Sequence, residues 1–144
     1  MKILVTGATG LIGRNLLPLL KDNGHEVIAL TRNTDTAGVR LPIACQIVHW
    51  DPTTHTPLPD FPENINAVIH LCGEGIADGR WTRKRKQAIY DSRVLSTRNL
   101  LNLFRKSKPL PKVWISASAI GYYKYSSHPA LEETSPPGNG FLAN

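Results

Sequence analysis

The fold is decided by the stretch Val5-Thr6-Gly7-Ala8-Thr9-Gly10-Leu11-Ile12-Gly13, in which glycine recurs at every third position. Residues 2–6, at the start of the chain, form a short β-branched and apolar run that is typical of a buried strand. After the glycines, apolar residues at helical spacing predict a helix that ends at Gly24, a residue suited to a left-handed cap. Pro18 lies inside this helix, where it removes one hydrogen bond, and we expect a kink there.

A glycine corner between a strand and a helix is suited to the linked phosphates of a dinucleotide. Gly7 permits the tight turn, Gly10 lets the backbone approach a pyrophosphate, and Gly13 lets the helix pack closely on the sheet. The first turn of the helix also offers unpaired N–H groups and a partial positive charge. The residues expected to contact the dinucleotide here are Gly7, Thr9, Gly10, Leu11, Ile12 and Gly13. The alternative is a glycine cluster that only makes a turn.

The rest of the chain predicts a parallel sheet. Further strands are expected at residues 26–31, 46–50, 67–72 and 113–118. A second helix is expected from an N-cap at Thr82 to Phe104, and the proline-rich residues 51–63 are expected to form a loop. The strands lack the alternation of a sheet with one wet face, so we predict a doubly wound Rossmann sheet in a three-layer α/β/α fold. Residues 1–144 are expected to form one such domain.

The composition and charge limit the class of protein. The 144 residues are 41% hydrophobic and 19% charged, and no apolar run has the roughly 20 residues that a membrane span needs. We expect a cytoplasmic protein without membrane contact, in which Cys45 and Cys72 stay reduced. The net charge is +6, but the basic run at 83–86 lacks interleaved aromatic residues, which favours a solvated helix face over a nucleic-acid site. The histidines show no metal-ligand spacing, so no metal is predicted.

The GxxGxxG spacing preceded by Thr6 resembles that of the extended and atypical short-chain dehydrogenases/reductases. Residues 69–73 resemble the family's fourth-strand segment under the cofactor, and residues 116–123 resemble its fifth-strand active-site segment. Within the NAD-dependent epimerase/dehydratase type, residues 73–78 and 92–93 are similar to a subgroup known as sugar-nucleotide epimerases or cell-division-inhibitor-like oxidoreductases. The resemblance covers the first half of the family's length. We therefore expect a piece of a longer protein, without its substrate-binding half.

The end of the second strand indicates which dinucleotide is bound. In this fold an acidic residue there accepts from the 2′-hydroxyl of NAD, whereas an arginine accommodates the 2′-phosphate of NADP. The strand ends Thr31-Arg32 with no acidic residue before Asp35, and the Arg32 guanidinium can make charge-assisted bonds with a phosphate. We predict NADP(H), with NAD as the less favoured cofactor; the remaining alternative is an ordinary surface arginine.

Further cofactor contacts follow from the resemblance. They are Thr31, Arg32, Trp50, Asp51, Leu71, Cys72, Gly73, Glu74 and Arg93. Asp51 either accepts from the adenine amino group or begins a turn, and Glu74 either reaches the nicotinamide ribose or caps its loop. Arg93 stands where typical extended members carry asparagine, and either binds a phosphate or substrate carboxylate or lies on the helix surface. Cys72 is expected to be a small core residue.

Ser118 is the one catalytic candidate. It matches the serine that hydrogen-bonds the substrate oxygen in the family's reaction, unless it only satisfies the backbone at a strand end. The family's YxxxK tyrosine would fall near Ala143, where the sequence has none, so no general acid is predicted. We expect an NADP-dependent oxidoreductase or epimerase-like protein that acts on a small polar or nucleotide-linked substrate. This chain alone is expected to be inactive. A homodimer formed through its helices is a further expectation. The alternative is a non-catalytic dinucleotide-binding redox sensor or scaffold.

Overall fold

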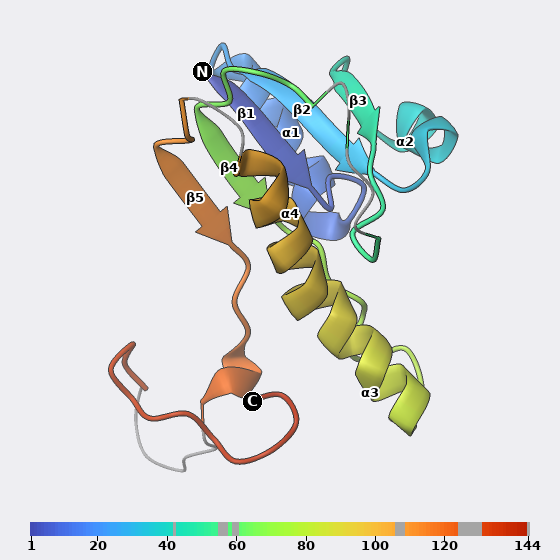
Figure 1. The fold of residues 1–144 in the computed structure, drawn as a ribbon, viewed down its shortest axis with the longest axis vertical. Coiled ribbons are helices and arrows are strands. Elements are labelled where there is room, and N and C mark those ends of the chain that lie inside the picture. Colours follow the sequence, from blue (N-terminus) through green and yellow to red (C-terminus); the bar gives the residue numbers. More distant parts are fainter. Residues whose placement is uncertain (42, 55–57, 59–60, 106–108, 124–130, 144) are drawn as a thin grey trace.

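The computed structural model describes residues 1–41, 43–54, 58, 61–105, 109–123 and 131–143. Five parallel strands form one sheet in the order β3-β2-β1-β4-β5, as Figure 1 shows. The strands are β1 (Lys2–Thr6), β2 (Glu26–Thr31), β3 (Gln46–His49), β4 (Ala67–His70) and β5 (Val113–Ser116). This is the Rossmann order, which reverses between β1 and β4, where such sheets bind their ligands. The predicted doubly wound parallel sheet is confirmed.

Helices on both faces of the sheet give the three predicted layers. They are α1 (Leu11–Asp22) and α2 (Thr34–Arg40) on one face and α4 (Ser96–Phe104) on the other. A further helix, α3 (Arg83–Tyr90), extends beyond the edge of the sheet (Figure 1), and a π-helical turn at Asp91–Leu95 joins it to α4. In Figure 1, α1 lies behind the sheet and α4 in front of it. After β5 the chain leaves the sheet beyond its carboxyl edge, on the side where α3 lies, with a short 3-10 turn at Ile120–Tyr122.

Two apolar cores lie on opposite faces of the sheet, because alternate residues of a strand point to opposite sides. Toward α1 and α2, the buried cluster includes Ile3, Val5, Leu17, Val27, Ala29, Ala37 and Ile69. Toward α4, it includes Leu4, Ile28, Leu30, Trp50, Ile65, Val68, Leu100 and Phe104. The predicted loop after β3 joins the second core, where Phe61 meets the Phe104 ring edge-on at 4.9 Å between centroids. Leu58 and Phe61, which the structure describes in this loop, thus pack against the core on the α4 side of the sheet.

The helix α1 ends as the sequence predicts. Gly24 has a φ of +73°, its N–H donates to the Lys21 carbonyl, and the His25 N–H donates to the Leu20 carbonyl. These are the two hydrogen bonds of a Schellman cap. The cap requires a left-handed backbone conformation, which glycine adopts without strain. Pro18 lies inside α1, and the helix continues beyond it to Asp22.

The sequence prediction placed no helix or strand in residues 32–45. This was wrong, because the structure has the helix α2 there. Two parallel neighbours such as β2 and β3 need a crossover connection, and α2 provides it. Local signals for this helix are present, since Asn33 Oδ1 accepts from the Thr36 N–H at 2.8 Å. The negative charge of Asp35 in the first turn and the positive charge of Arg40 in the last turn both interact favourably with the helix dipole.

The predicted N-cap at Thr82 is confirmed, because its hydroxyl oxygen accepts from the Arg85 N–H at 3.2 Å. The strands β4 and β5 end two residues earlier than predicted, at His70 and Ser116. Leu71 still donates its N–H to the Thr6 carbonyl at 3.1 Å before the chain turns away. In the described residues, none of the helices combines the length and apolar character that crossing a bilayer requires.

Candidate functional site

The glycine corner lies at the carboxyl end of β1, where it touches the end of β4. Gly7 has a φ of +70°, and a Cβ placed on it would lie 2.7 Å from the carbonyl carbon and oxygen of Leu71. Both the backbone conformation and the close approach therefore exclude a side chain at this position. The absence of a side chain lets the corner close directly over the switch point of the sheet.

The other two glycines shape the start of α1. A Cβ on Gly13 would lie 2.3 Å from the Ala8 carbonyl oxygen, so Gly13 makes room for the corner's own backbone. The atoms nearest to such a Cβ all belong to the Ala8 backbone. Gly10 is the N-cap residue, with no side chain to cap the helix. The N–H groups of the first turn, at Leu11, Ile12 and Gly13, have no carbonyl partner within the helix.

The outer surface of this corner is open. Gly10 is exposed, and the Leu11 and Ile12 side chains are 74% and 61% exposed, although both are large and apolar. Thr9 is half-buried. Uncapped N–H groups at a helix N-terminus, bordered by exposed apolar side chains, form a surface suited to an anionic ligand with apolar parts.

At the end of β2, Arg32 is exposed and forms neither a hydrogen bond nor an ion pair with the residues that the structure describes. The residue before it, Thr31, is held by the neighbouring strand, because its carbonyl accepts a hydrogen bond from the Trp50 N–H at 2.8 Å. The Arg32 charge lies close enough to contribute to the pKa shifts of Asp51 and Cys72. The Arg32 guanidinium thus has no hydrogen-bond or ion-pair partner among the described residues, and its charge is felt at the ends of β3 and β4.

After β3, Asp51 begins a turn. Its Oδ1 accepts from the Thr53 hydroxyl at 2.7 Å and from the Thr53 N–H at 2.8 Å, and these hydrogen bonds lower the pKa of the Asp51 carboxyl. The Trp50 side chain is 3% exposed and belongs to the core, so it offers no open surface to a ligand. Of the two roles considered for Asp51, the turn is the one that the structure displays.

A residue that the sequence did not single out holds this turn in place. Asn99 on α4 is buried and donates its Nδ2 to the Pro52 carbonyl at 2.8 Å. Its Oδ1 is buried without a hydrogen-bond partner among the described residues. An asparagine on a predicted helix gives no sign of such a contact, because the partner lies 47 positions away.

After β4, the loop is tied to the helix that follows it. The Glu74 N–H donates to Ser92 Oγ at 2.9 Å, and the Glu74 carbonyl accepts from Arg93 Nη1 at 3.1 Å. The Glu74 carboxylate forms an ion pair with Arg85 at 2.7 Å. Glu74 thus has the loop-capping contacts that were the alternative to a role at the nicotinamide ribose.

Arg93 and Ser92 both lie on the π-helical turn, a feature often found at functional sites. Arg93 Nη1 also donates to the Ile89 carbonyl at 3.3 Å, and its Nη2 would lie 3.2 Å from a Cβ on Gly73. The guanidinium is therefore packed against the loop after β4 and supports its backbone. Cys72, in the same loop, packs against the second core, and burial raises the pKa of its thiol, as expected for a small core residue.

A buried polar network beneath the glycine corner was also absent from the sequence prediction. His70 Nδ1 lies 2.7 Å from Thr6 Oγ1, and His70 Nε2 lies 3.1 Å from Thr97 Oγ1 and 3.3 Å from Ser96 Oγ. The Thr97 and Ser96 hydroxyls donate their protons to helix carbonyls, so they accept from Nε2–H. Nδ1 then accepts from the Thr6 hydroxyl. Burial lowers the pKa of His70, which keeps the imidazole neutral.

The catalytic candidate Ser118 lies in the chain after β5. It is exposed, and its hydroxyl makes no hydrogen bond with the described residues, so it does not simply satisfy the backbone of a strand end. The N–H of neighbouring Ala117 donates to the His70 carbonyl at 3.0 Å, which fixes this segment beside the end of β4. Within the described residues, no cluster of histidine, cysteine or acidic side chains is arranged to hold a metal ion.

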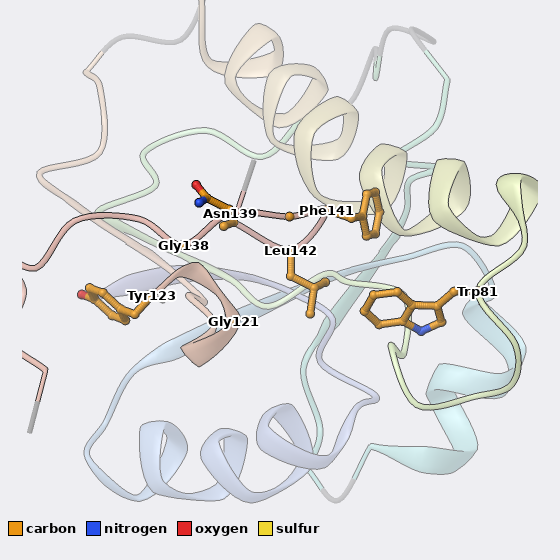
Figure 2. A pocket seen from close by; sticks show the side chains of 9 residues that line it. Trp81, Gly121, Tyr123, Gly138, Asn139, Phe141 and Leu142 are labelled. Atoms are coloured by element: carbon orange, nitrogen blue, oxygen red, sulfur yellow. The ribbon is translucent and has the colours of Figure 1, made fainter. Parts of the chain in front are cut away.

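A pocket of about 450 Å³ lies beyond the carboxyl edge, between Trp81 and the C-terminal segment. Figure 2 shows the Leu142 side chain between Tyr123 and Trp81, with Phe141 above Trp81. The Trp81 and Phe141 rings meet edge-on at 5.8 Å between centroids. The loop before α3 and the end of the described chain are thus joined by an aromatic contact.

The family model of the "NAD dependent epimerase/dehydratase family" matches residues 3–141. The chain belongs to this family. The resemblance of the glycine corner, the fourth-strand segment and the fifth-strand segment to epimerase/dehydratase proteins is thereby confirmed. The glycine corner lies at the switch point between β1 and β4, the place where sheets of this kind bind their ligands.

Individual members of the epimerase/dehydratase family are similar over nearly the whole chain. The epimerase family protein YfhF of Bacillus subtilis is 37% identical over 135 residues, which are 94% of this chain and 43% of YfhF. The crystal structure of human epimerase family protein SDR39U1 (isoform 2) with NADPH is 29% identical with a TM-score of 0.79, over 99% of this chain and 45% of that protein. MoeE5 in complex with UDP-glucose and NAD has the same fold, at 24% identity and a TM-score of 0.76, over 99% of this chain and 44% of MoeE5. The chain therefore spans less than half the length of these relatives.

Proposed function

We propose that this chain binds NADP(H) at the carboxyl edge of the sheet, with the pyrophosphate over Gly10 and the 2′-phosphate beside Arg32. The observation that carries the proposal is the uncapped N-terminus of α1, which a side-chain-free corner presents at the switch point between β1 and β4. Linked phosphates fit such a surface because it offers free N–H groups and a partial positive charge.

The choice of NADP over NAD rests on Arg32. An exposed guanidinium without an ion pair among the described residues is free to make charge-assisted bonds with a 2′-phosphate. The NADPH complex of human SDR39U1 supports this choice, while the NAD complex of MoeE5 keeps NAD as the alternative. The remaining contacts in the proposal come from the loop after β4, at Leu71, Cys72 and Gly73, whereas Glu74 holds this loop through its contacts with Ser92, Arg93 and Arg85.

The proposed domain is residues 1–144, as the nucleotide-binding part of a longer oxidoreductase or epimerase-like protein that acts on a small polar or nucleotide-linked substrate. Val113 and Ile115 on β5 are 45% and 51% exposed, which supports a further element packing on this end of the sheet. In this proposal Ser118 hydrogen-bonds the reacting oxygen of the substrate, because it lies two residues beyond β5, is exposed and has no hydrogen-bond partner among the residues that the structure describes.

The test is calorimetric titration of the purified chain with NADPH, NADP, NADH and NAD. Micromolar binding of NADPH, with NADH at least tenfold weaker, is the expected result. A chain that binds none of the four nucleotides would contradict the proposal.

A second function is favoured by the missing tyrosine near Ala143. Without a general acid, the same site would serve a non-catalytic redox sensor or scaffold that responds to the bound dinucleotide. Oxidation of NADPH by the full-length protein with candidate carbonyl substrates separates the two functions, since the sensor would bind NADPH without consuming it.

A further inference from the structure

The basic run at the start of α3 divides into side chains with different surroundings. The Arg85 side chain is 21% exposed and pairs with Glu74 at 2.7 Å and with Asp78 at 3.6 Å. Arg83 and Lys86 form no ion pair with a carboxylate of the described residues. The sequence predicts a solvated helix face here, and Arg85 departs from it because it is paired; of the other three cations in the run, Arg83 and Lys86 share a further feature.

These two cations line a hollow of about 450 Å³. Its lining consists of Trp81, Arg83, Lys86, Gln87, Tyr90 and Phe141. Positions i, i+3, i+4 and i+7 of a helix share a face, which explains why four of these residues point into one hollow. Trp81 and Phe141 close it from the loop before α3 and from the C-terminal segment. Its volume is typical of a site for a small ligand.

The aromatic walls of the hollow are partly free. The Trp81 and Tyr90 side chains are 39% and 44% exposed, more than a role in the core would require. Lys86 Nζ lies 5.6 Å from the centre of the Phe141 ring, so its charge is held over an aromatic face. The acid that follows this helix, Asp91, is engaged by the hollow's own Gln87, whose Nε2 donates to Asp91 Oδ1 at 2.9 Å. Two cations without a carboxylate partner among the described residues give the hollow a positive charge. The exposed aromatic faces beside them offer a surface on which a ring can stack.

We propose that this hollow binds the anionic end of the substrate, a phosphate or carboxylate attached to a ring. Arg83 and Lys86 hold the oxyanion, and the ring lies against Trp81 and Tyr90. The inference rests on the proposed function, because α3, which lines the hollow, lies beyond the carboxyl edge of the sheet (Figure 1) and Arg85 on α3 pairs with Glu74 in the loop after β4. A single small molecule fits better than a nucleic-acid strand, which requires an extended groove with successive stacking positions.

The experiment uses phenyl phosphate and benzoate as charged probes and phenol as the uncharged one, titrated into the chain by calorimetry with saturating NADPH present. Phenyl phosphate is expected to bind at least tenfold more tightly than phenol. The double variant Arg83→Gln, Lys86→Gln is expected to lose at least tenfold of this affinity. Lys84→Gln is the matched control, since Lys84 belongs to the same run but does not line the hollow, and its affinity should change less than twofold.

Three outcomes overturn the inference. They are equal binding of phenol and phenyl phosphate, an unchanged affinity in the double variant, and a single-stranded oligonucleotide that binds more tightly than phenyl phosphate through the same two residues. NADPH affinity, measured in parallel, reports on the cofactor proposal separately. A double variant that keeps NADPH binding and its circular dichroism spectrum but loses phenyl phosphate supports the hollow as a site distinct from the glycine corner.

Discussion

The Thr6 hydroxyl and the His70 imidazole are joined by a 2.7 Å hydrogen bond that crosses from the carboxyl end of β1 to that of β4. On its other side the imidazole meets Ser96 and Thr97, at the start of α4. Thr6 directly precedes Gly7, so one buried ring connects the glycine corner, the strand beside it and the helix α4, which follows the π-helical turn that carries Arg93. The geometry of the proposed cofactor site therefore depends on a histidine that stays neutral.

Acidification is expected to destabilise the fold through His70. Burial lowers the pKa of His70, so below about pH 6.5, the ordinary pKa of a histidine, the unfolded chain takes up a proton that the folded chain does not. The free energy of unfolding then falls as the pH decreases, until the pH drops below the pKa of the folded state. Urea unfolding at several values between about pH 7.5 and 5 should show this slope in the wild type and a smaller one in His70→Gln. Identical slopes would exclude His70 as the cause.

Replacement of Arg32 is expected to discriminate between the two cofactors. Hydrogen bonds to charged groups contribute about 1.5–3 kcal/mol, so Arg32→Ala should weaken NADPH binding by roughly tenfold or more while NADH binding changes little. Arg40→Ala serves as the matched control, because Arg40 is equally exposed and lies at the far end of α2. Equal losses for NADPH and NADH would remove the assignment of the 2′-phosphate to Arg32.

Gly10 offers a direct test of the phosphate position. A Cβ on Gly10 would lie 3.2 Å from the Gly7 carbonyl oxygen, a contact that small shifts can relieve, so we expect Gly10→Val to fold. Its side chain would occupy the space over the N-terminus of α1, and NADPH binding should be lost. Gly38→Ala is the control, since nothing lies within 4 Å of a Cβ there. Retained NADPH affinity in Gly10→Val would place the phosphates elsewhere.

The parts of this structure that the sequence predicts are those specified by local signals. The glycine corner, the cap at Thr82 and the Schellman cap at Gly24 each depend on residues within a few positions of one another. The helix α2 has such signals as well, but its seven residues are too few for an apolar periodicity to appear.

The contacts that shape the site depend instead on strand register and helix packing. Thr6 lies opposite His70 only because β1 and β4 pair in that register, and no spacing in the sequence reveals it. The same holds for the Asn99 contact with Pro52, which links segments 47 positions apart in the chain. The Arg85 pair with Glu74 spans 11 positions, but it depends on how the loop after β4 packs against α3. A sequence resemblance indicates which residues surround a cofactor, whereas their hydrogen-bond partners follow only from the fold.

Arg93 allows the structural and the ligand-binding roles of one residue to be separated. Its Nη1 donates to the Glu74 and Ile89 carbonyls, so Arg93→Ala should lower the free energy of unfolding by about 1–2 kcal/mol and loosen the loop after β4. Amide hydrogen exchange at Glu74 measures that loosening, and Arg98→Ala, an exposed arginine on α4, is the control. If Arg93 only supports the loop, Arg93→Lys should recover part of both the stability and the NADPH affinity, because an ammonium can still donate to one carbonyl. A variant with normal exchange at Glu74 but weakened NADPH binding would instead show that the guanidinium contacts the nucleotide itself.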